Sequence, residues 1–383
     1  MKVLCRAALP ALMGLCLATP TSAQTIANDL AATLDEHVPA WLEETGDPGL
    51  AVVVIEDCRP ALIRAWGIAD RKSGRPMSQG TVFNLGSISK TLTAWGVMRL
   101  EESGAIELDA PVGRYLERWA LPTSEFDAEA VTVRRLLSHT AGLNVPSVAG
   151  VDPDTAPPSL LDELEKGRPA EGMEPVRIVQ PPGTAFDYSG GGYLVLQLLV
   201  EDVTGQPFAE WMAGQVLQPL GMASSAYGLD PSLIGRAATP YATDGAQYAH
   251  RVYPGLAAAG LWSTAEDVGM FLAAHCTDRE GKLAGEGVVS PDGLASMWIA
   301  QPPAERYGLG YEVYPPLGEE PVVGHSGSNF GWKADFLLFP RLGVGIAALT
   351  NVDEGETRMA VMKAFRDAVV AAARAGTMIT APQ

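Results

Sequence analysis

Strand-like apolar segments lie near both ends of this 383-residue chain, and the region between them is mainly helical in pattern. Residues 49–55 form a continuous β-branched run, and residues 61–69 form a second run after a short polar break, which is typical of a buried β-hairpin. Near the C-terminus the strand-like segments are residues 308–314, 322–325, 332–339 and 344–350. The sequence therefore predicts an α+β fold in which both ends of the chain complete one sheet.

Helical spacing of apolar residues predicts a first helix over residues 26–44, which Pro39 is expected to kink or to end early. We expect a last helix over residues 357–375, stopped by Gly376. In the middle, the spacing predicts helices over 87–103, 132–138, 191–204 and 207–217. We expect one catalytic domain over residues 24–383, with a sheet lobe from 24–80 and 300–383 and a mostly helical lobe inserted over 81–299. Residues 144–184 read as a long loop that borders the substrate cleft.

The first residues resemble an export signal. Lys2 and Arg6 precede an apolar stretch over residues 7–18, and small residues lead up to Ala23. This pattern predicts a secretory signal peptide over residues 1–23, and therefore a periplasmic or extracellular protein. The stretch is too short for a membrane span, and no membrane-spanning run follows it.

Charge and composition exclude several classes of partner. The net charge of −18 argues against nucleic acid or an anionic membrane and leaves a small molecule or a short peptide as the substrate. Five scattered histidines show no metal-ligand spacing, so neither a metal nor another cofactor is expected. Cys58 and Cys276 remain once the signal is removed, and they could pair in an oxidising compartment. The sequence leaves open whether they lie close enough.

The motif Ser87-Ile88-Ser89-Lys90 begins one of the expected helices. A serine hydroxyl is a poor nucleophile until a base removes its proton. Residues three apart share a helix face, so Lys90 can be the base for Ser87. Ser87 at the helix N-terminus also lies where backbone N–H groups favour negative charge. The spacing predicts a Ser/Lys acyl-transfer centre. The alternative is that Ser87 merely caps a helix and that Lys90 is solvated.

Two further segments carry candidate chemistry. Tyr188 precedes a helix, and near a lysine ammonium its pKa would fall, so that it could carry a proton to a leaving group. Its alternative is a half-buried structural tyrosine. In the segment 324–328, Gly327 would let a substrate backbone approach, His325 and Ser326 would flank a bound carbonyl, and the Ser328 N–H could donate to an oxyanion. The alternative there is a strand with a bulge at its glycine.

Taken together and in this order, these segments resemble the serine β-lactamase and penicillin-binding protein family, which includes class C β-lactamases, D,D-carboxypeptidases, D-aminopeptidases and esterases. The resemblance covers nearly the whole chain after the signal. The segments that carry it are 83–90, 136–143, 182–184, 219–222, 260–264 and 325–327.

The resemblance implies a central antiparallel sheet flanked by helices, with the active site between the sheet and the helical lobe. It implies Ser87 as the acylated nucleophile, Lys90 as its proton acceptor and Tyr188 as the acid/base partner. The backbone N–H groups of Ser87 and Ser328 would form the oxyanion hole. Substrate-binding positions would be Gly190, His325, Ser326 and Gly327.

Two positions depart from the family pattern. Gly190 stands where the family's Tyr-x-Asn motif has an amide, and His325 stands where dedicated β-lactamases have a lysine. Because histidine is only partly charged near neutral pH, it makes a weaker site for a substrate carboxylate. Both departures favour a secreted serine hydrolase that acts on D-amino-acid peptides, amides or esters.

Three alternatives remain beside this one. They are a β-lactamase, a non-catalytic binding protein of the same fold, and an α/β-hydrolase that uses His139 or His325 in a triad. The last lacks a Gly-x-Ser-x-Gly elbow, since the segment 324–328 ends in Ser328. A binding protein would be expected to have lost Ser87 or Lys90, and both are present.

Overall fold

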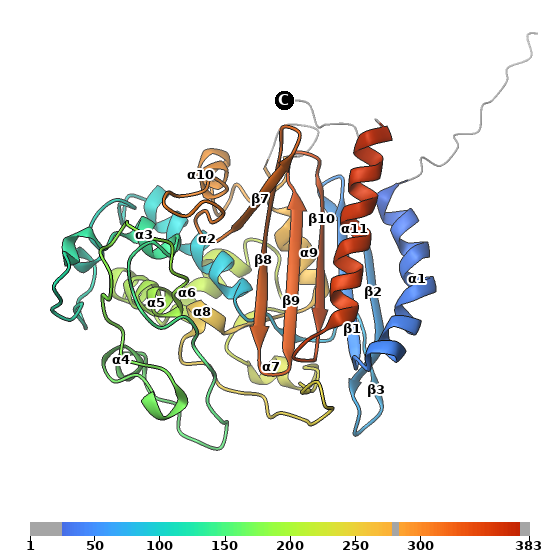
Figure 1. Ribbon diagram of the computed structural model, residues 1–383, viewed down its shortest axis with the longest axis horizontal. Coiled ribbons are helices and arrows are strands. Elements are labelled where there is room, and N and C mark those ends of the chain that lie inside the picture. Colours follow the sequence, from blue (N-terminus) through green and yellow to red (C-terminus); the bar gives the residue numbers. More distant parts are fainter. Residues whose placement is uncertain (1–24, 278–282, 376–383) are drawn as a thin grey trace, which may run out of the picture.

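The computed structural model describes residues 25–277 and 283–375, and the expected signal peptide lies outside them (Figure 1). Its centre is a seven-stranded antiparallel sheet in the order β3-β2-β1-β10-β9-β8-β7. The strands are β1 (Gly49–Glu56), β2 (Arg59–Asp70), β3 (Arg75–Pro76), β7 (Glu312–Leu317), β8 (Glu320–Asn329), β9 (Trp332–Phe339) and β10 (Val344–Thr350). Strand β1 pairs with β10, with Leu50 opposite Thr350. Both ends of the chain therefore complete one sheet, as predicted.

Helices cover both faces of this sheet. Helices α1 (Ile26–Thr45) and α11 (Glu356–Ala375) pack against each other on one face, where Figure 1 shows them side by side. Helix α9 (Ala265–Ala273) contacts β1, β2 and β10 on the other face. The remaining α-helices of the described residues are α2 (Ile88–Glu102), α3 (Val133–Leu137), α4 (Leu160–Glu165), α5 (Gly190–Thr204), α6 (Phe208–Met212), α7 (Pro231–Ile234), α8 (Leu256–Ala259) and α10 (Pro291–Met297). Short strands β4 (Phe83–Asn84), β5 (Ala226–Tyr227) and β6 (Leu261–Ser263) form a second sheet.

The two layers explain why β1 reads as a continuous apolar run. Alternate side chains of a strand point to opposite faces, and here both faces are covered. Leu50, Val52 and Val54 belong to the core shared with α1 and α11. Ala51 and Val53 belong to the larger core that extends through α9 to the helical side.

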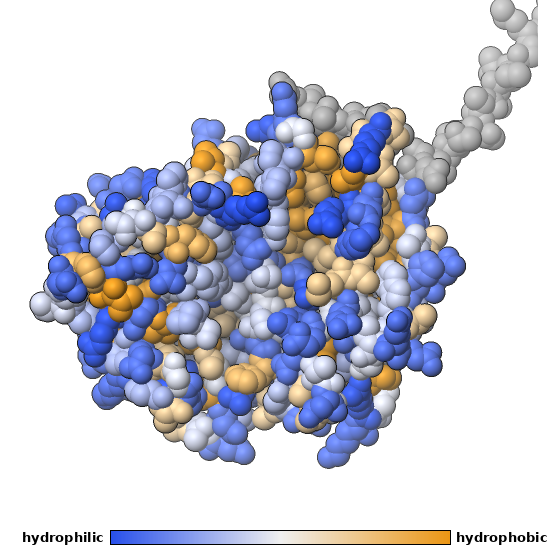
Figure 2. All heavy atoms as spheres, viewed as in Figure 1, coloured by the Kyte–Doolittle hydropathy of each residue, from blue (hydrophilic) through white to orange (hydrophobic). Residues whose placement is uncertain are grey.

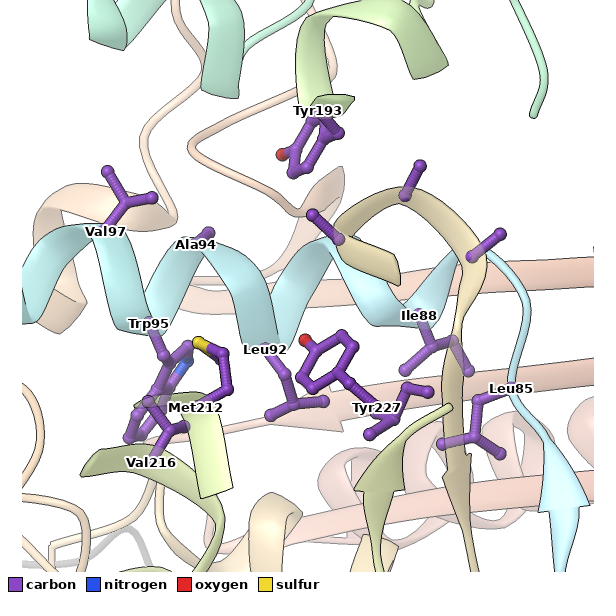
Figure 3. Close-up of a cluster of buried hydrophobic side chains, with 14 of the residues drawn as sticks. Leu85, Ile88, Leu92, Ala94, Trp95, Val97, Tyr193, Met212, Val216 and Tyr227 are labelled. Carbon is purple, nitrogen blue, oxygen red and sulfur yellow. The ribbon is translucent and has the colours of Figure 1, made fainter. Parts of the chain in front are cut away.

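Helix α2 is buried along nearly its whole length. Its buried residues occur on every side of the helix, from Ile88 to Leu100. Figure 3 shows Tyr193 on one side of α2, and Met212 and Tyr227 on the other. A helix surrounded in this way also buries the polar residues near its first turn, among them Lys90.

Several boundaries differ from the sequence expectations. Pro39 does not end α1, which continues to Thr45. The apolar residues whose spacing predicted this helix are all buried: Ile26, Leu30, Leu34, Val38 and Leu42. Strand β7 begins at Glu312, four residues later than expected, because the chain turns at Gly310 with a positive φ. Strand β8 extends to Asn329 and so contains the whole 324–328 segment. The loop over 144–184 includes the short helix α4, and Gly376 lies outside the described residues.

The described surface includes one broad apolar area that the sequence did not indicate. Figure 2 shows it beside α11, where residues of β7, β8 and β9 face the helix across a cavity of about 800 Å³. Within residues 25–277 and 283–375, no helix has the length and apolar character needed to cross a membrane. No group of three or more His, Cys, Asp or Glu side chains in the same ranges is arranged to hold a metal ion.

Candidate active site

Ser87 and Lys90 lie together at the first turn of α2. Lys90 Nζ is 3.1 Å from Ser87 Oγ, and it also donates to the Ala258 carbonyl at 2.8 Å. The Ser87 hydroxyl makes no capping hydrogen bond to the helix, so the capping alternative does not apply. The turn is fixed instead by Ser89, whose hydroxyl donates to the Gly86 carbonyl and accepts from the Leu261 N–H of β6. This leaves the Ser87 hydroxyl directed to Lys90.

Burial controls the charge of Lys90. Lys90 is only 2% exposed. Among the described residues, no carboxylate forms an ion pair with its amine. The rings of Tyr188 and Tyr193 lie 5.0 and 5.6 Å from Nζ. Desolvation in this setting lowers the pKa of Lys90 from 10.5 to about 7. A large fraction of Lys90 is therefore an uncharged amine near neutral pH.

Tyr188 lies just before α5 and faces the same centre. Burial raises the pKa of its phenol, and a hydrogen bond with Ser87 acts in the opposite direction. The expected fall in the pKa of Tyr188 was wrong, because burial of the phenol itself outweighs the hydrogen bond with Ser87. Tyr188 consequently keeps its proton. A protonated Tyr188 can act as a proton donor in this site.

His139 supports Tyr188 from behind. The imidazole lies 4.0 Å from the Tyr188 ring, and its Nδ1 accepts from the Ser189 N–H at 3.0 Å. Because Nδ1 accepts, the neutral ring carries its hydrogen on Nε2. Desolvation keeps the pKa of His139 well below 6.5. This ring is hydrogen-bonded neither to Ser87 nor to a carboxylate, so the geometry does not support a triad at His139.

Backbone contact brings the two expected oxyanion donors together. A Cβ added to Gly86 would lie 2.5 Å from the Ser328 nitrogen, so only a glycine lets β8 approach the start of α2 this closely. Along β8, the Ser326 N–H points to Glu312 of β7, and the Ser328 N–H, two residues on, points to the same edge. Beyond Gly324 that edge is no longer paired with β7 and faces Ser87. The N–H groups of Ser87 and Ser328 therefore border one opening.

His325 is buried and fully hydrogen-bonded. Its Nδ1 lies 2.6 Å from the Ser326 carbonyl, and its Nε2 lies 2.8 Å from the Tyr307 hydroxyl. Since a carbonyl only accepts, Nδ1 carries the hydrogen and Nε2 accepts from Tyr307. Burial lowers the pKa of His325 to about 4, so the ring is neutral at pH 7. It presents no positive charge to a substrate.

Ser326 and Gly190 have partners that the sequence did not reveal. The exposed Ser326 hydroxyl donates to Glu312 Oε1 at 2.9 Å. A Cβ on Gly190 would lie 3.0 Å from a methyl of Val148, a residue of the loop over 144–184. That loop therefore occupies the space that a longer side chain at position 190 would need.

Two pockets meet at Tyr188. The first, about 440 Å³, is lined by Ser87, Lys90, Tyr188, Ser328 and residues 146–149. The expectation that the loop over 144–184 borders the cleft is met by these four loop residues. The second pocket, about 540 Å³, is lined by Phe186, Tyr188, Pro303, Glu305, Arg306, Tyr307, Glu312, Val313 and Tyr314.

The sequence pattern did not identify Glu312 or Tyr307 as site residues, although it carries one signal for Glu312. Glu312 is a lone charge within an apolar segment, and a hairpin that turns near Gly318 places it opposite Gly324. Strand register thus connects Glu312 to the 324–328 segment. Tyr307 offers no such signal, because it lies in a turn whose path depends on tertiary packing.

The model of the Beta-lactamase family matches residues 34–371 of this chain. The chain belongs to the Beta-lactamase family. Within the described residues, Ser87, Lys90, Tyr188 and Ser328 line one pocket of this fold.

Relatives of this Beta-lactamase family member carry several names. The esterase EstB of Burkholderia gladioli is 33% identical over 210 residues, and the match spans about half of each chain, 53% of both. A β-lactamase of Yersinia enterocolitica is 29% identical over 320 residues, or 82% of this chain and 77% of the relative. The octameric penicillin-binding protein homologue from Pyrococcus abyssi superposes with a TM-score of 0.71 at 26% identity, covering 90% of this chain and 77% of that one.

Proposed function

We propose that this protein is an exported serine hydrolase that forms an acyl-enzyme at Ser87 and acts on D-amino-acid peptides, amides or esters. The observation that carries this proposal is the buried Lys90 amine, 3.1 Å from Ser87 Oγ, with its pKa lowered to about 7. A base with a pKa near the working pH transfers protons most effectively. Export rests on the N-terminal pattern alone.

In the first half of the reaction, Lys90 accepts the proton of Ser87 as Oγ attacks the substrate carbonyl. The carbonyl oxygen becomes an oxyanion, which the N–H groups of Ser87 and Ser328 stabilise. One such donor typically lowers the activation barrier by about 2.7–4 kcal/mol. Tyr188 gives its proton to the leaving atom as the bond between carbonyl carbon and leaving group breaks, and Lys90 returns a proton to Tyr188.

In the second half, water attacks the acyl-enzyme and replaces the leaving group. The water proton passes to Lys90 through Tyr188, and the acyl–oxygen bond to Ser87 breaks. Ser87 Oγ regains its proton from Lys90, so the free enzyme is restored. The net reaction adds one water to the substrate and requires neither oxidant nor metal.

β-Lactam hydrolysis is the second candidate, and the match to the Yersinia enterocolitica β-lactamase favours it. The neutral His325 and the carboxylate of Glu312 argue against it, because β-lactams carry a carboxylate beside the reacting bond. A non-catalytic binding protein remains a third candidate. It would have no need for a desolvated Lys90 beside Ser87.

Active-site labelling tests the proposal. A fluorophosphonate should form a covalent adduct, and mass spectrometry should find it on the peptide that contains Ser87. The Ser87→Ala variant should not react, and the Ser73→Ala variant, which removes an exposed serine far from the site, should react as the wild type does. An adduct on a different residue, or none with a folded protein, would eliminate the acyl-enzyme proposal.

A further inference from the structure

Tyr188 lies between the pocket that contains Ser87 and the second pocket, and its side chain lines both. The acyl group stays bonded to Ser87, in the first pocket with Ser328. Tyr188 lines both pockets, and in the proposed function it protonates the leaving atom. The leaving group therefore passes Tyr188 into the second pocket, whose chemistry then determines which leaving groups fit.

Aromatic rings and one ionised carboxylate make up much of that pocket. The rings of Phe186, Tyr188, Tyr307 and Tyr314 line it, with Phe186 and Tyr307 5.7 Å apart. Aromatic faces attract cations, most strongly where water is partly excluded. The same faces offer nothing to a carboxylate.

Glu312 is held in its charged form by its neighbours. The Ser326 hydroxyl and N–H both donate to Oε1, and the Tyr314 hydroxyl donates to Oε2. Burial raises the pKa of Glu312, whereas attraction to His325 and the hydrogen bonds from Tyr314 and Ser326 lower it, and the net shift is downward. Because burial keeps His325 neutral at pH 7, the three donated hydrogen bonds are the contacts that stabilise the charged carboxylate at that pH.

The other charges that line this pocket are peripheral. Glu305 and Arg306 are both exposed, and neither makes an ion pair within residues 25–277 and 283–375. Exposed charges are screened by water and salt. The half-buried Glu312 is the charge closest to the Ser326 donors.

We propose that this pocket selects a positively charged leaving group, such as an ammonium-bearing amine, alcohol or thiol, and excludes a leaving group that bears a carboxylate, with Glu312 as the discriminating residue. The inference rests on the proposed function, because it assumes hydrolysis at Ser87. It narrows the substrate class to esters and amides whose departing half is cationic or neutral. Peptides that lose a C-terminal amino acid, whose leaving group carries a carboxylate, are excluded.

Three acetyl thioesters test the inference, since they share the acyl group and differ only in the leaving thiol. The thiols are thiocholine, which is cationic, ethanethiol, which is neutral, and 3-mercaptopropionate, which is anionic. Thiol release gives kcat/KM for each. Wild-type protein should prefer the cationic thioester over the anionic one by about tenfold or more, the effect of a partly screened charge a few ångströms away.

Glu312→Gln should lower the ratio of the cationic to the anionic rate at least about tenfold, and Glu312→Asp should retain most of it. Normalising to the neutral thioester separates this shift from any general loss of activity or fold. The control is Glu319→Gln, an exposed glutamate in the turn of the same hairpin, which should leave the ratio unchanged.

Other outcomes would overturn the inference and are distinguishable from failure of the proposed function. Hydrolysis of all three thioesters at similar rates would reject charge selection while leaving Ser87 catalysis intact. A preference for the anionic thioester that Arg306→Gln abolishes would show that Arg306, not Glu312, controls the pocket. Hydrolysis of none, together with no fluorophosphonate adduct at Ser87, would reject both proposals.

Discussion

A Cβ added to Gly327 would lie 2.0 Å from the Leu85 carbonyl oxygen, so β8 and the segment that precedes Ser87 are in direct backbone contact. Real Cβ atoms do not approach an oxygen this closely, and the backbone on one side would have to move. The contact sets the spacing of the Ser87 and Ser328 N–H groups, which we propose as the oxyanion hole. Strand β8 is thereby coupled to the N-terminus of α2.

Gly327→Ala should consequently reduce fluorophosphonate labelling and ester hydrolysis by about a hundredfold or more, the effect of losing one oxyanion donor. We also expect a lower melting temperature, because the strand must shift. Gly113→Ala is the matched control, since a Cβ there meets no atom within 4 Å and the φ of Gly113 is not positive. If Gly327→Ala were labelled at the wild-type rate, the contact between Gly327 and Leu85 would not be needed for catalysis, and this prediction would be wrong.

A second prediction concerns the protonation of Lys90. Because its pKa is lowered to about 7, kcat/KM for a neutral ester should rise with pH and level off above pH 7. Lys90→Arg should lose at least about a hundredfold in kcat/KM, since a guanidinium does not release its proton in this range. A pH–rate profile measures the first effect. A rate that keeps rising up to pH 10 would indicate a lysine with an ordinary pKa.

Burial of Lys90 should also cost stability at neutral pH. Between pH 7 and 10.5 the unfolded chain binds a proton at this lysine and the folded chain does not, so unfolding free energy rises with pH in that window. The cost near pH 7 is on the order of 4 kcal/mol. Lys90→Met should therefore be more stable than wild type at pH 7 by urea unfolding, and the gap should narrow toward pH 10. A gap that does not depend on pH would contradict the lowered pKa.

Tyr188→Phe should reduce kcat more than it raises KM, because the ring remains and only the proton carrier is removed. A loss in kcat of about a hundredfold is typical for a general acid. The comparison variant is Tyr193→Phe, whose hydroxyl donates to the Leu137 carbonyl and whose ring also faces Lys90. We expect it to lose stability and far less rate. Equal losses in kcat for the two variants would make Tyr188 a structural residue.

The sequence left open whether Cys58 and Cys276 lie close together, and the structure places them in neighbouring segments. The Cys58 thiol donates to the carbonyl of Thr277, the residue after Cys276, at 3.5 Å, and interaction with Cys58 raises the pKa of the Cys276 thiol; no disulfide joins the two cysteines in this structure. The contact connects the β1–β2 turn with the residues just after α9. We expect oxidised glutathione to convert the pair to a disulfide, with release of two reduced glutathiones and a stabilisation of about 2–4 kcal/mol.

Mass spectrometry of the unreduced protein and thermal unfolding would measure this, with Cys58→Ser as the control that gains no stability on oxidation. Two thiols that still react with iodoacetamide after prolonged treatment would contradict it. The outcome bears on the proposed export, because such a pair persists as a disulfide only in an oxidising compartment.

Much of the fold could be predicted because its signals are local. The β1 run is apolar throughout since both of its faces are covered, and the spacing of the apolar residues in α1 matches its buried stripe. The boundary of β7 was wrong because Gly310 turns the chain, and a positive φ at one glycine cannot be read from the strand pattern. The sequence pattern did not predict helix α9, because this helix has only nine residues and most of them are apolar, so it shows no clear helical spacing.

In the candidate site, too, local relationships could be predicted from the sequence and properties that depend on tertiary packing could not. Ser87 and Lys90 could be paired from the sequence because one helical turn separates them. The direction of the shift in the pKa of Tyr188 could not be predicted, because it depends on how deeply the phenol is buried, and burial is a property of the whole packing. The neutral state of His325 likewise follows from its burial, and its hydrogen-bond partner Tyr307 is eighteen residues away in the chain.

The central claim is that Lys90 is an uncharged amine beside Ser87 at neutral pH. NMR of protein labelled with ¹³C at the lysine ε-carbons measures this directly, since the ε-carbon shift follows the charge of the amine, and Lys90→Met identifies the signal. We predict that the Lys90 signal titrates near pH 7. A Lys90 signal that still reports a charged amine at pH 9 would contradict the account.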